Sequence, residues 1–205
     1  MVQGTPGAAP RLETGRVILT LPKLGDVSAA DEFVAYLERN HEHFAPWSPP
    51  EPSGLRSREG ALRRIQLMHA EYGAGSSIRF WLRRKAESGQ PLSGAVSLSQ
   101  IFLGPFRACY LGYQLDRDAV GLGLMQEALT KVIEYAFTEL RLHRLMANYA
   151  PTNERSGRLL RRLGFVVEGY ARDYLFIGGQ FRDHVLTSLT NHGLADAERL
   201  CTPGL

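Results

Sequence analysis

The stretch Val120-Gly121-Leu122-Gly123-Leu124 stands between a strand-like run, Tyr110 to Leu115, and a strongly periodic helical segment. Glycine admits the backbone conformations of a tight loop and leaves main-chain N–H groups accessible. At the entrance of a helix, such N–H groups and the positive end of the helix dipole bind anions. The stretch therefore predicts a strand, a glycine loop that can cradle a pyrophosphate, and a helix, in that order.

Two other phosphate-binding loops do not fit this stretch. No Lys-Ser or Lys-Thr pair follows the glycines, which argues against a nucleoside-triphosphate P-loop. The dinucleotide fingerprint needs three glycines and a βαβ unit near the N-terminus, and residues 120–125 hold only two glycines. A glycine pair before a helix is otherwise an ordinary turn, so the interpretation depends on the sequence that follows.

The segment after the loop has the periodicity of an amphipathic helix. Apolar residues recur at spacings of three and four and form one face: Met125, Leu129, Val132, Ile133, Ala136, Phe137 and Leu140. Strand, turn and helix signals then alternate to the end of the chain. We expect a strand over 143–149, a turn and cap over 151–153, a helix over 154–163 stopped by Gly164, and strands over 166–177 and 181–189 joined at Gly178-Gly179.

The chain before residue 108 predicts a supporting frame. A first strand is expected over Val17 to Leu21, and Ser28 can cap a helix. A proline-rich loop, His43 to Ser57, holds Trp47. The first helix is expected to bury Phe33, Val34 and Leu37. A second helix is expected to bury Ala61, Leu62, Ile65 and Met68, and strands are expected over 78–84 and 92–102.

The order strand, Gly-x-Gly, long helix, strand, Asn-x-x-Ser, short helix, Leu-Gly-Phe and closing hairpin resembles the acetyl-CoA-dependent N-acetyltransferase (GNAT) superfamily. Matching runs cover most of residues 108–190, whereas the N-terminal half matches only in outline. The runs include Ala108 to Tyr113, Gly123 to Met125, Glu127 to Leu129, His143-Arg144, Met146 to Tyr149, Asn153, Arg155 to Gly157, Arg162 to Phe165, Glu168 to Tyr170, Asp173 to Leu175 and Arg182 to Thr187.

This resemblance implies an α/β (α+β) fold, in which helices flank a mixed, mostly antiparallel twisted sheet that splays at the cofactor site. It implies acetyl-CoA as the cofactor and transfer of its acetyl group to the N-terminal α-amine, of the alanine type, of a ribosomal protein. The cofactor is expected on Gln114, Leu115, Val120, Gly121, Leu122, Gly123, Leu124, Asn153 and Ser156, and the acceptor beside Trp47, Tyr170 and Asp173.

Two positions depart from the superfamily pattern. The phosphate loop usually opens with Gln or Arg three residues before the first glycine, and Asp118 stands there. Because an acid repels a pyrophosphate, we expect Asp118 to point away and the backbone amides to make the contact. The tyrosine that often protonates the leaving thiolate corresponds to Leu160, so another acid is needed.

Ser156 is the candidate acid, because the Asn-x-x-Ser spacing puts Asn153 and Ser156 on the first turn of the short helix. A purely structural interpretation also exists: Asn153 as a helix cap and Ser156 as a small packing residue. The strand over 108–115 holds no carboxylate, so a strong general base is not evident there. Water oriented by Tyr110, Glu168 or Asp173 is the expected substitute.

The absence of an evident base bears on the acceptor. An α-amino group has a reference pKa of about 7.7–8.0, against about 10.4 for lysine. Deprotonating lysine therefore costs about 3.5 kcal/mol more, at about 1.36 kcal/mol per pKa unit. A site without a strong base fits an N-terminal amine better than a lysine side chain.

Composition fits a single domain. The 205 residues are 44% hydrophobic, enough for one sizeable core. We expect a disordered segment over 1–10, the acetyltransferase domain over 11–192 and a tail over 193–205. No apolar run approaches the length of a membrane span, and Met1 to Arg16 lacks the features of an export signal. Cys109 and Cys201 do not have the spacing of metal ligands. We therefore expect a reduced cytoplasmic protein.

The formal net charge of +3 argues against strong nucleic-acid binding, and we expect no sequence-specific contact with a nucleic acid. A contact with the ribosomal particle stays open. His41-Glu42-His43 lacks further ligands, so no metal is expected. Two alternative functions remain: an acetyltransferase of a small amine such as an aminoglycoside or polyamine, and a non-catalytic module that binds ribosomal particles.

Overall fold

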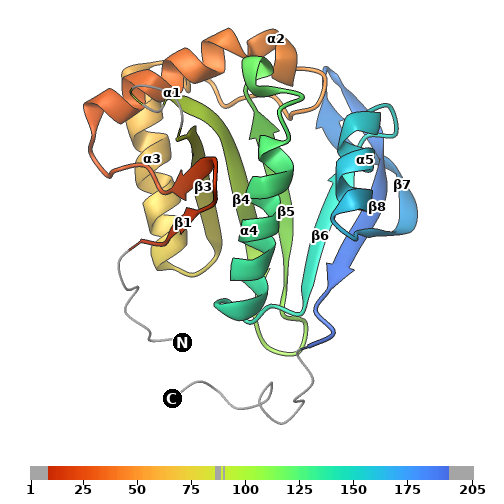
Figure 1. Cartoon of the computed structure of the whole chain (residues 1–205). Helices are drawn as coiled ribbons and strands as arrows, with labels where there is room; N and C mark the ends of the chain where they lie inside the picture. Colours follow the sequence, from red (N-terminus) through yellow and green to blue (C-terminus); the bar gives the residue numbers. More distant parts are fainter. Residues whose placement is uncertain (1–8, 86–88, 90, 194–205) are drawn as a thin grey trace.

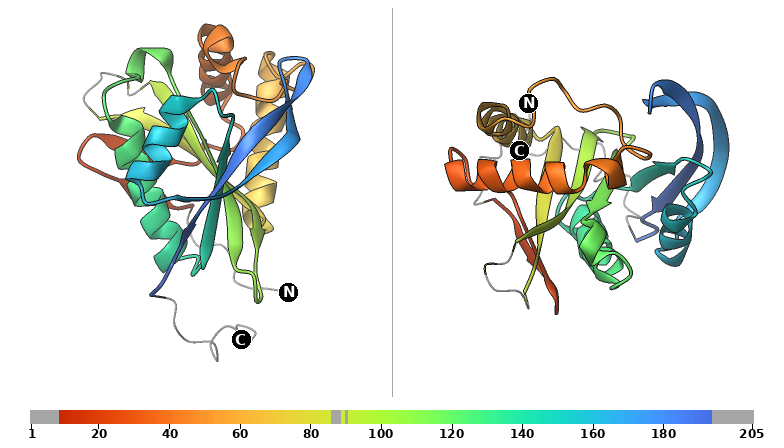
Figure 2. Two further views of the ribbon diagram at one scale, coloured as in Figure 1. Left: turned by 90° about the vertical axis from the view of Figure 1, so that its right-hand side faces the viewer. Right: turned by 90° about the horizontal axis from the view of Figure 1, so that it is seen from above.

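The computed structural model describes residues 9–85, 89 and 91–193, which fold around one twisted sheet of eight strands (Figures 1 and 2). The strand order is β1-β2-β3-β4-β5-β6-β8-β7, and every neighbouring pair is antiparallel except β5 and β6. The strands are β1 (Arg11–Glu13), β2 (Val17–Thr20), β3 (Ser77–Arg84), β4 (Leu92–Phe102), β5 (Ala108–Leu115), β6 (Arg144–Tyr149), β7 (Val166–Ile177) and β8 (Gln180–Thr190). The expected mixed, mostly antiparallel sheet is confirmed.

Helices cover both faces of this sheet (Figure 1). They are α1 (Val27–Arg39), α2 (His41–Phe44), α3 (Arg58–Gly73), a 3-10 turn (Arg117–Ala119), α4 (Leu124–Thr138) and α5 (Glu154–Arg162). Alternate side chains of a strand face opposite sides. On β3, Phe80 therefore joins the core under α4 and α5, whereas Trp81 joins a second core under α1 and α3.

The start of α1 differs from the expectation. Asp26, not Ser28, is the N-cap, and its carboxylate accepts a hydrogen bond from the Ala29 N–H at 3.2 Å. Asp caps a helix as well as Ser does, so the helix begins at the earlier of the two signals. The short strand β1 and the short helix α2 were not expected from the sequence.

Parts of the expected domain boundaries lie outside the described residues. These parts are residues 1–8 of the expected N-terminal segment and residues 194–205 of the expected tail, which include Cys201. Cys109 is buried in the core under α4, and burial raises the pKa of its thiol to about 12. Within the described ranges, none of the helices has the length and apolar character needed to cross a bilayer.

Candidate active site

The sheet opens between its two parallel strands. Pairing of β5 with β6 covers Ala108↔Arg144, Cys109↔Leu145 and Tyr110↔Met146 and goes no further. Beyond this point the strands diverge, and a cavity of about 490 Å³ lies between the ends of β5 and β6, the glycine loop and α5. Since alternate backbone N–H and C=O groups of β5 point away from β4, the splayed end of β5 offers unpaired groups to a ligand in this cavity. The splay expected from the sequence is therefore present.

The glycine loop forms one end of the cavity. Gly121 and Gly123 have φ angles of +84° and +74°, and α4 begins directly after them at Leu124. These left-handed conformations favour glycine. They form the tight turn that leads directly into α4. Val120 and both glycines line the cavity, whereas the Leu122 side chain is exposed and that of Leu124 is buried in the core.

Arg16 contacts this loop without lining the cavity. Its Nη1 donates to the Leu122 carbonyl at 2.9 Å, and its Nε donates to the Glu127 carboxylate at 2.7 Å. Glu127 also accepts hydrogen bonds from the Arg16 N–H, at 2.9 Å, and from the Thr14 hydroxyl. The turn between β1 and β2 thus places a guanidinium next to the loop. In the superfamily pattern, a Gln or Arg at position 118 often provides a side chain at this loop, and this chain has Asp118 there instead.

Asp118 points away from the cavity, as expected. Its side chain is 80% exposed and lies 3.7 Å from Arg117. Its backbone N–H donates to Asp116 at 3.1 Å, so the residue contributes its main chain rather than its charge to the loop.

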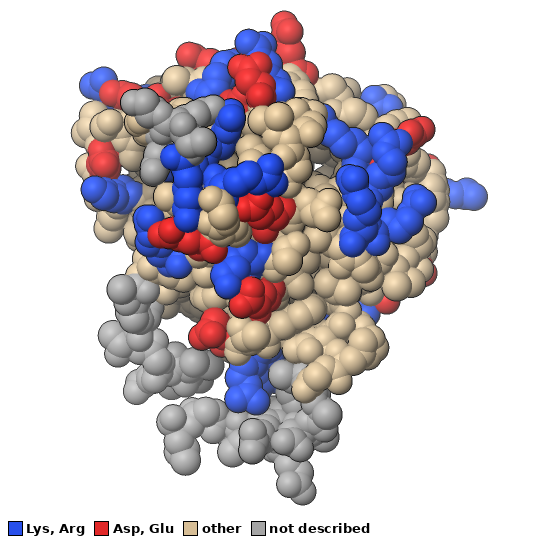
Figure 3. Space-filling view, viewed as in Figure 1, with Lys and Arg blue, Asp and Glu red and all other residues tan. Residues whose placement is uncertain are grey.

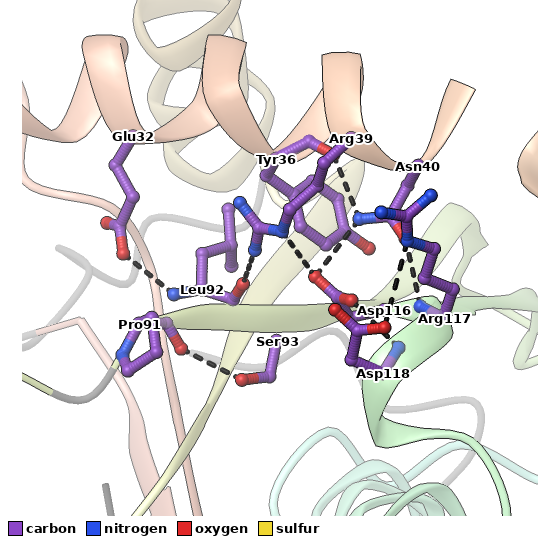
Figure 4. A network of polar contacts seen from close by, with 10 residues as sticks. All are labelled: Glu32, Tyr36, Arg39, Asn40, Pro91, Leu92, Ser93, Asp116, Arg117 and Asp118. Atoms are coloured by element: carbon purple, nitrogen blue, oxygen red, sulfur yellow. Dashed lines mark hydrogen bonds and ion pairs between the residues drawn. The ribbon is translucent and has the colours of Figure 1, made fainter. Parts of the chain in front are cut away.

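Asp116 joins the end of β5 to the end of α1 (Figure 4). Its carboxylate accepts hydrogen bonds from Arg39 at 2.6 Å and from Asn40 at 3.0 Å, and Asn40 in turn accepts from the Arg117 N–H at 2.9 Å. Burial alone raises the pKa of the Asp116 carboxyl, but the bonds from Asn40, the Asp118 N–H and Arg39 outweigh burial and hold this pKa below its usual value.

We expect Asp116→Asn to lower the free energy of unfolding by about 2 kcal/mol at pH 7, because the charged acceptor of Arg39 is lost. A carboxyl with a lowered folded-state pKa stabilises the fold above its unfolded-state pKa of about 3.9, and this contribution is lost as the pH falls through the folded-state value. The difference between wild type and variant should therefore shrink as the pH falls below about 4. Urea denaturation at pH 7 and at a pH below about 4 measures this difference in the free energy of unfolding. An equal difference at the two pH values would contradict the role of the charge.

The first turn of α5 brings Asn153 and Ser156 to the cavity. The Asn153 side chain caps the helix by accepting from the Ser156 N–H at 3.2 Å. The Ser156 hydroxyl lies 2.6 Å from the Tyr113 hydroxyl, and both residues line the cavity. Burial raises the pKa of Tyr113 to about 12, so its phenol keeps its proton at neutral pH.

Tyr113 was not expected from the sequence as a site residue. It lies on β5, whereas the family's usual phenol stands on the short helix, so no motif spacing indicated it. Leu160, at the corresponding helix position, is buried in the core and does not line the cavity. A Cβ on Gly157 would lie 2.8 Å from the Tyr149 ring, so glycine lets α5 pack closely on β6. The hydroxyl pair Tyr113 and Ser156 thus faces the place where a leaving thiolate is expected.

The opposite wall of the cavity is formed by the segment after α2 and by β5. Trp47 and Leu115 line it, and the Gln114 side chain donates to the Ser48 hydroxyl at 2.9 Å. His43 also lines the cavity, and burial, followed by the charge of Arg155, lowers the pKa of this imidazole. These contacts bring the expected residues Trp47, Gln114 and Leu115 into one site with the glycine loop.

His184 on β8 also lines this cavity, and its side chain is buried. Its Nδ1 lies 3.0 Å from the Arg182 carbonyl, which can only accept, so Nδ1 carries the proton and Nε2 of the neutral ring keeps its lone pair. The ring packs against Tyr174, with centroids 5.3 Å apart, and Asn148 donates to the Tyr174 hydroxyl at 2.9 Å. His184 was not expected as a site residue, because no motif spacing in the sequence indicates that it lies at the splay.

The other expected catalytic and acceptor residues lie outside the cavity lining. Hydrogen bonds from Ser188 and Arg144 lower the pKa of Glu168, and the Tyr110 hydroxyl hydrogen-bonds to that of Tyr174. Tyr170 donates to Asp183 at 2.7 Å, and the backbone N–H of Asp173, where φ is +45°, donates to the same carboxylate at 2.9 Å. The roles of Tyr110, Glu168, Tyr170 and Asp173 stay predictions.

Basic side chains gather over α5 (Figure 3). The helix carries Arg155, Arg158, Arg161 and Arg162, and of these Arg155 and Arg162 line the cavity. Arg158 is paired with Glu154 at 2.7 Å. Among the described residues, no group of three or more His, Cys, Asp and Glu side chains could hold a metal ion.

Comparisons with known proteins agree with this geometry. Residues 16–166 match the family described as "Acetyltransferase (GNAT) domain". The chain is 41% identical to RimJ of Escherichia coli K12, the "[Ribosomal protein uS5]-alanine N-acetyltransferase", over 88% of this chain and 90% of that protein. It is 33% identical to "Probable N-acetyltransferase YjcK" of Bacillus subtilis, over 86% of this chain and 96% of that protein.

Solved structures also resemble the fold. The crystal structure of the ribosomal-protein-S5-alanine acetyltransferase from Vibrio fischeri superposes with a TM-score of 0.82 at 34% identity, and the match covers 91% of this chain and all of that one. The resemblance found in the sequence is therefore confirmed across both halves of the chain. With its splayed sheet, glycine loop and family match over residues 16–166, this chain belongs to the GNAT family of acetyltransferases.

Proposed function

We propose that this enzyme transfers the acetyl group of acetyl-CoA to the N-terminal α-amine of a ribosomal protein whose first residue is alanine. The observation that carries the proposal is one cavity that joins a glycine loop, the splayed end of β5 and the Tyr113–Ser156 hydroxyl pair. The names of the relatives from E. coli and V. fischeri support this acceptor class.

The residues present fit the donor. Backbone N–H groups of the loop at Gly121 and Gly123 would hold the pyrophosphate at the positive end of α4. Asn153 and the unpaired backbone groups of β5 would bond the amides of the pantetheine arm. Arg155 and Arg162 bring positive charge to the cavity, which suits the 3′-phosphate.

The reaction forms a C–N bond and breaks the C–S bond of the thioester. N–H groups near Gln114 would polarise the thioester carbonyl. Ser156 would protonate the thiolate, and the Tyr113 hydroxyl at 2.6 Å could resupply the proton. Tyr113 thus supplies the phenol that is missing at position 160.

A proton must also leave the attacking amine, and His184 is the base that we favour. It lines the cavity and keeps the Nε2 lone pair, whereas the hydrogen bonds to Glu168 make that carboxylate a weaker base. The earlier candidates Tyr110, Glu168 and Asp173 would act only through water, since none of them lines the cavity.

We expect selectivity for an α-amine over a lysine side chain, because no carboxylate stands on β5 to offset the higher pKa of lysine. A peptide that begins with alanine and carries an internal lysine should be acetylated once, at its N-terminus. The same peptide with a blocked N-terminus should react at least about 100-fold more slowly. This factor is smaller than the one that corresponds to the difference of about 3.5 kcal/mol between deprotonating a lysine side chain and an α-amine. Mass spectrometry of both peptides locates the acetyl group.

Comparable acetylation of the blocked peptide on its lysine would contradict the proposal. Acetylation of a polyamine or aminoglycoside in preference to both peptides would favour the small-amine alternative. Acetyl-CoA binding without transfer to any acceptor would favour the non-catalytic ribosome-binding alternative. The first alternative calls for several acids beside the acceptor site, and among the residues described as lining the cavity there is no carboxylate.

We also propose that the enzyme is cytoplasmic. There it would meet the ribosomal protein either free or in a ribosomal particle, and the enzyme itself would make no sequence-specific contact with a nucleic acid. The proposed domain runs from residue 11 to residue 192. Its elements extend from Arg11 at the start of β1 to Thr190 at the end of β8.

A further inference from the structure

A second and larger cavity adjoins the active site. This groove of about 1010 Å³ shares Phe44, Ser48 and Gln114 with the first cavity. It runs between α3, the loop after α2 and the tip of the β7–β8 hairpin at Gly178-Gly179, which lie near one another in Figure 2, left. A chain that presents its N-terminal amine beside Gln114 can therefore continue into this groove.

The groove is lined by partly buried arginines with too few counter-charges. Arg56 is paired with Glu51 at 2.7 Å. Within the described part of the chain, Arg64 and Arg79 share one carboxylate, that of Glu71, at 3.9 Å and 3.5 Å.

The charge of Arg64 and Arg79 is incompletely neutralised. The Arg79 Nε and the Glu71 Oε2 face each other at 3.5 Å, and both atoms are buried without a hydrogen bond to any described residue. Burial, followed by the neighbouring charge of Arg79, lowers the pKa of Arg64. Two guanidinium groups that share one carboxylate leave one positive charge in excess, which favours binding of an anionic group.

The sheet fixes how far this charge lies from the splayed strand. Arg79 is paired with Ser97 on β4, and Ser97 with Gly112 on β5, so the three residues form one row across neighbouring strands. Two spacings of about 4.8 Å separate the backbones of Gly112 and Arg79 by about 10 Å. An extended chain covers this distance in about three residues, at about 3.3 Å each. On β3, Arg79 points away from the side of Phe80 and thus toward the face covered by α3.

We propose that this groove binds the acceptor chain behind its N-terminal residue and that Arg64 and Arg79 select an acidic side chain at its third to fifth position. This inference rests on the proposed function and names the acceptor more narrowly: an N-terminal segment that carries a carboxylate. The two arginines act on specificity and take no part in the acetyl transfer.

The test uses lysine-free peptides that begin with alanine and carry one glutamate at a single position from 2 to 8, each compared with the glutamine peptide. We expect glutamate at position 3, 4 or 5 to raise kcat/KM about tenfold, equivalent to about 1.4 kcal/mol. In Arg79→Gln and Arg64→Gln this preference should fall to about twofold or less. The kcat/KM for the glutamine peptides should change little.

The matched control is Arg63→Gln, because Arg63 stands next to Arg64 on α3 but is exposed and does not line the groove. This variant should keep the full preference, and acetyl-CoA affinity should be unchanged in all three variants. A wild-type enzyme that acetylates glutamate and glutamine peptides equally would overturn the acidic preference and leave the proposed function standing. A preference that survives in both groove variants would overturn the assignment to Arg64 and Arg79. Acetylation of none of the peptides would overturn both proposals.

Discussion

Gly121→Trp should bind acetyl-CoA at least about 100-fold more weakly than the wild type, a loss of about 2.8 kcal/mol. Gly121 lines the active-site cavity, and a Cβ built on it meets no protein atom within 4 Å. An indole there would occupy the space in which the loop N–H groups meet the pyrophosphate. Isothermal titration calorimetry with acetyl-CoA measures the loss.

The control for this variant is Gly75→Trp. Gly75 also has a positive φ, +67°, and a Cβ there also meets nothing within 4 Å, but it lies after α3 and lines neither cavity. Both variants strain the backbone to a similar degree, so the comparison isolates the blocked cradle. Equal affinities in two folded variants would place the pyrophosphate elsewhere. Gly123 is a poorer choice, because its Cβ would point toward Arg16, with 3.5 Å to Nη2.

Local sequence signals predicted the elements of the site well. The glycine loop, the amphipathic α4 and the Asn153 cap each depend on residues within one or two turns, and all three are present. The splay of β5 from β6 came from the family resemblance, and the register confirms it. These features follow from backbone preferences that a single sequence shows directly.

The residues that the sequence did not indicate come from distant parts of the chain. Arg16 contacts the glycine loop across 106 positions of the chain, and Tyr113 contacts Ser156 across 43. His184 reaches the cavity only because β8 pairs with β6, which places strand 180–190 beside the splay. Such contacts depend on strand order and register, and no local spacing encodes them.

His184→Asn should lower kcat/KM by about 100-fold or more, within the range of about 10² to 10⁴ typical of general base catalysis. The imidazole takes up the proton of the attacking amine, so the wild type should be active at a pH at which much of the acceptor amine is still protonated. The variant should instead gain its activity only as the pH approaches about 8, where the α-amine of the acceptor itself loses its proton. Initial rates with an alanine peptide from pH 5.5 to 9 measure both profiles.

Two further variants separate this role from packing and from the other histidine of the cavity. His69→Asn removes a histidine that bonds to the Pro22 carbonyl and lines neither cavity, so it should keep the wild-type profile. His43→Asn should keep the wild-type pH profile, because burial and the charge of Arg155 lower the pKa of this imidazole and make it a poor base. If His43→Asn changes the pH profile and His184→Asn keeps it, the base is His43. If His184→Asn changes only KM, with an unaltered pH profile, then His184 positions the acceptor and the proton leaves through water.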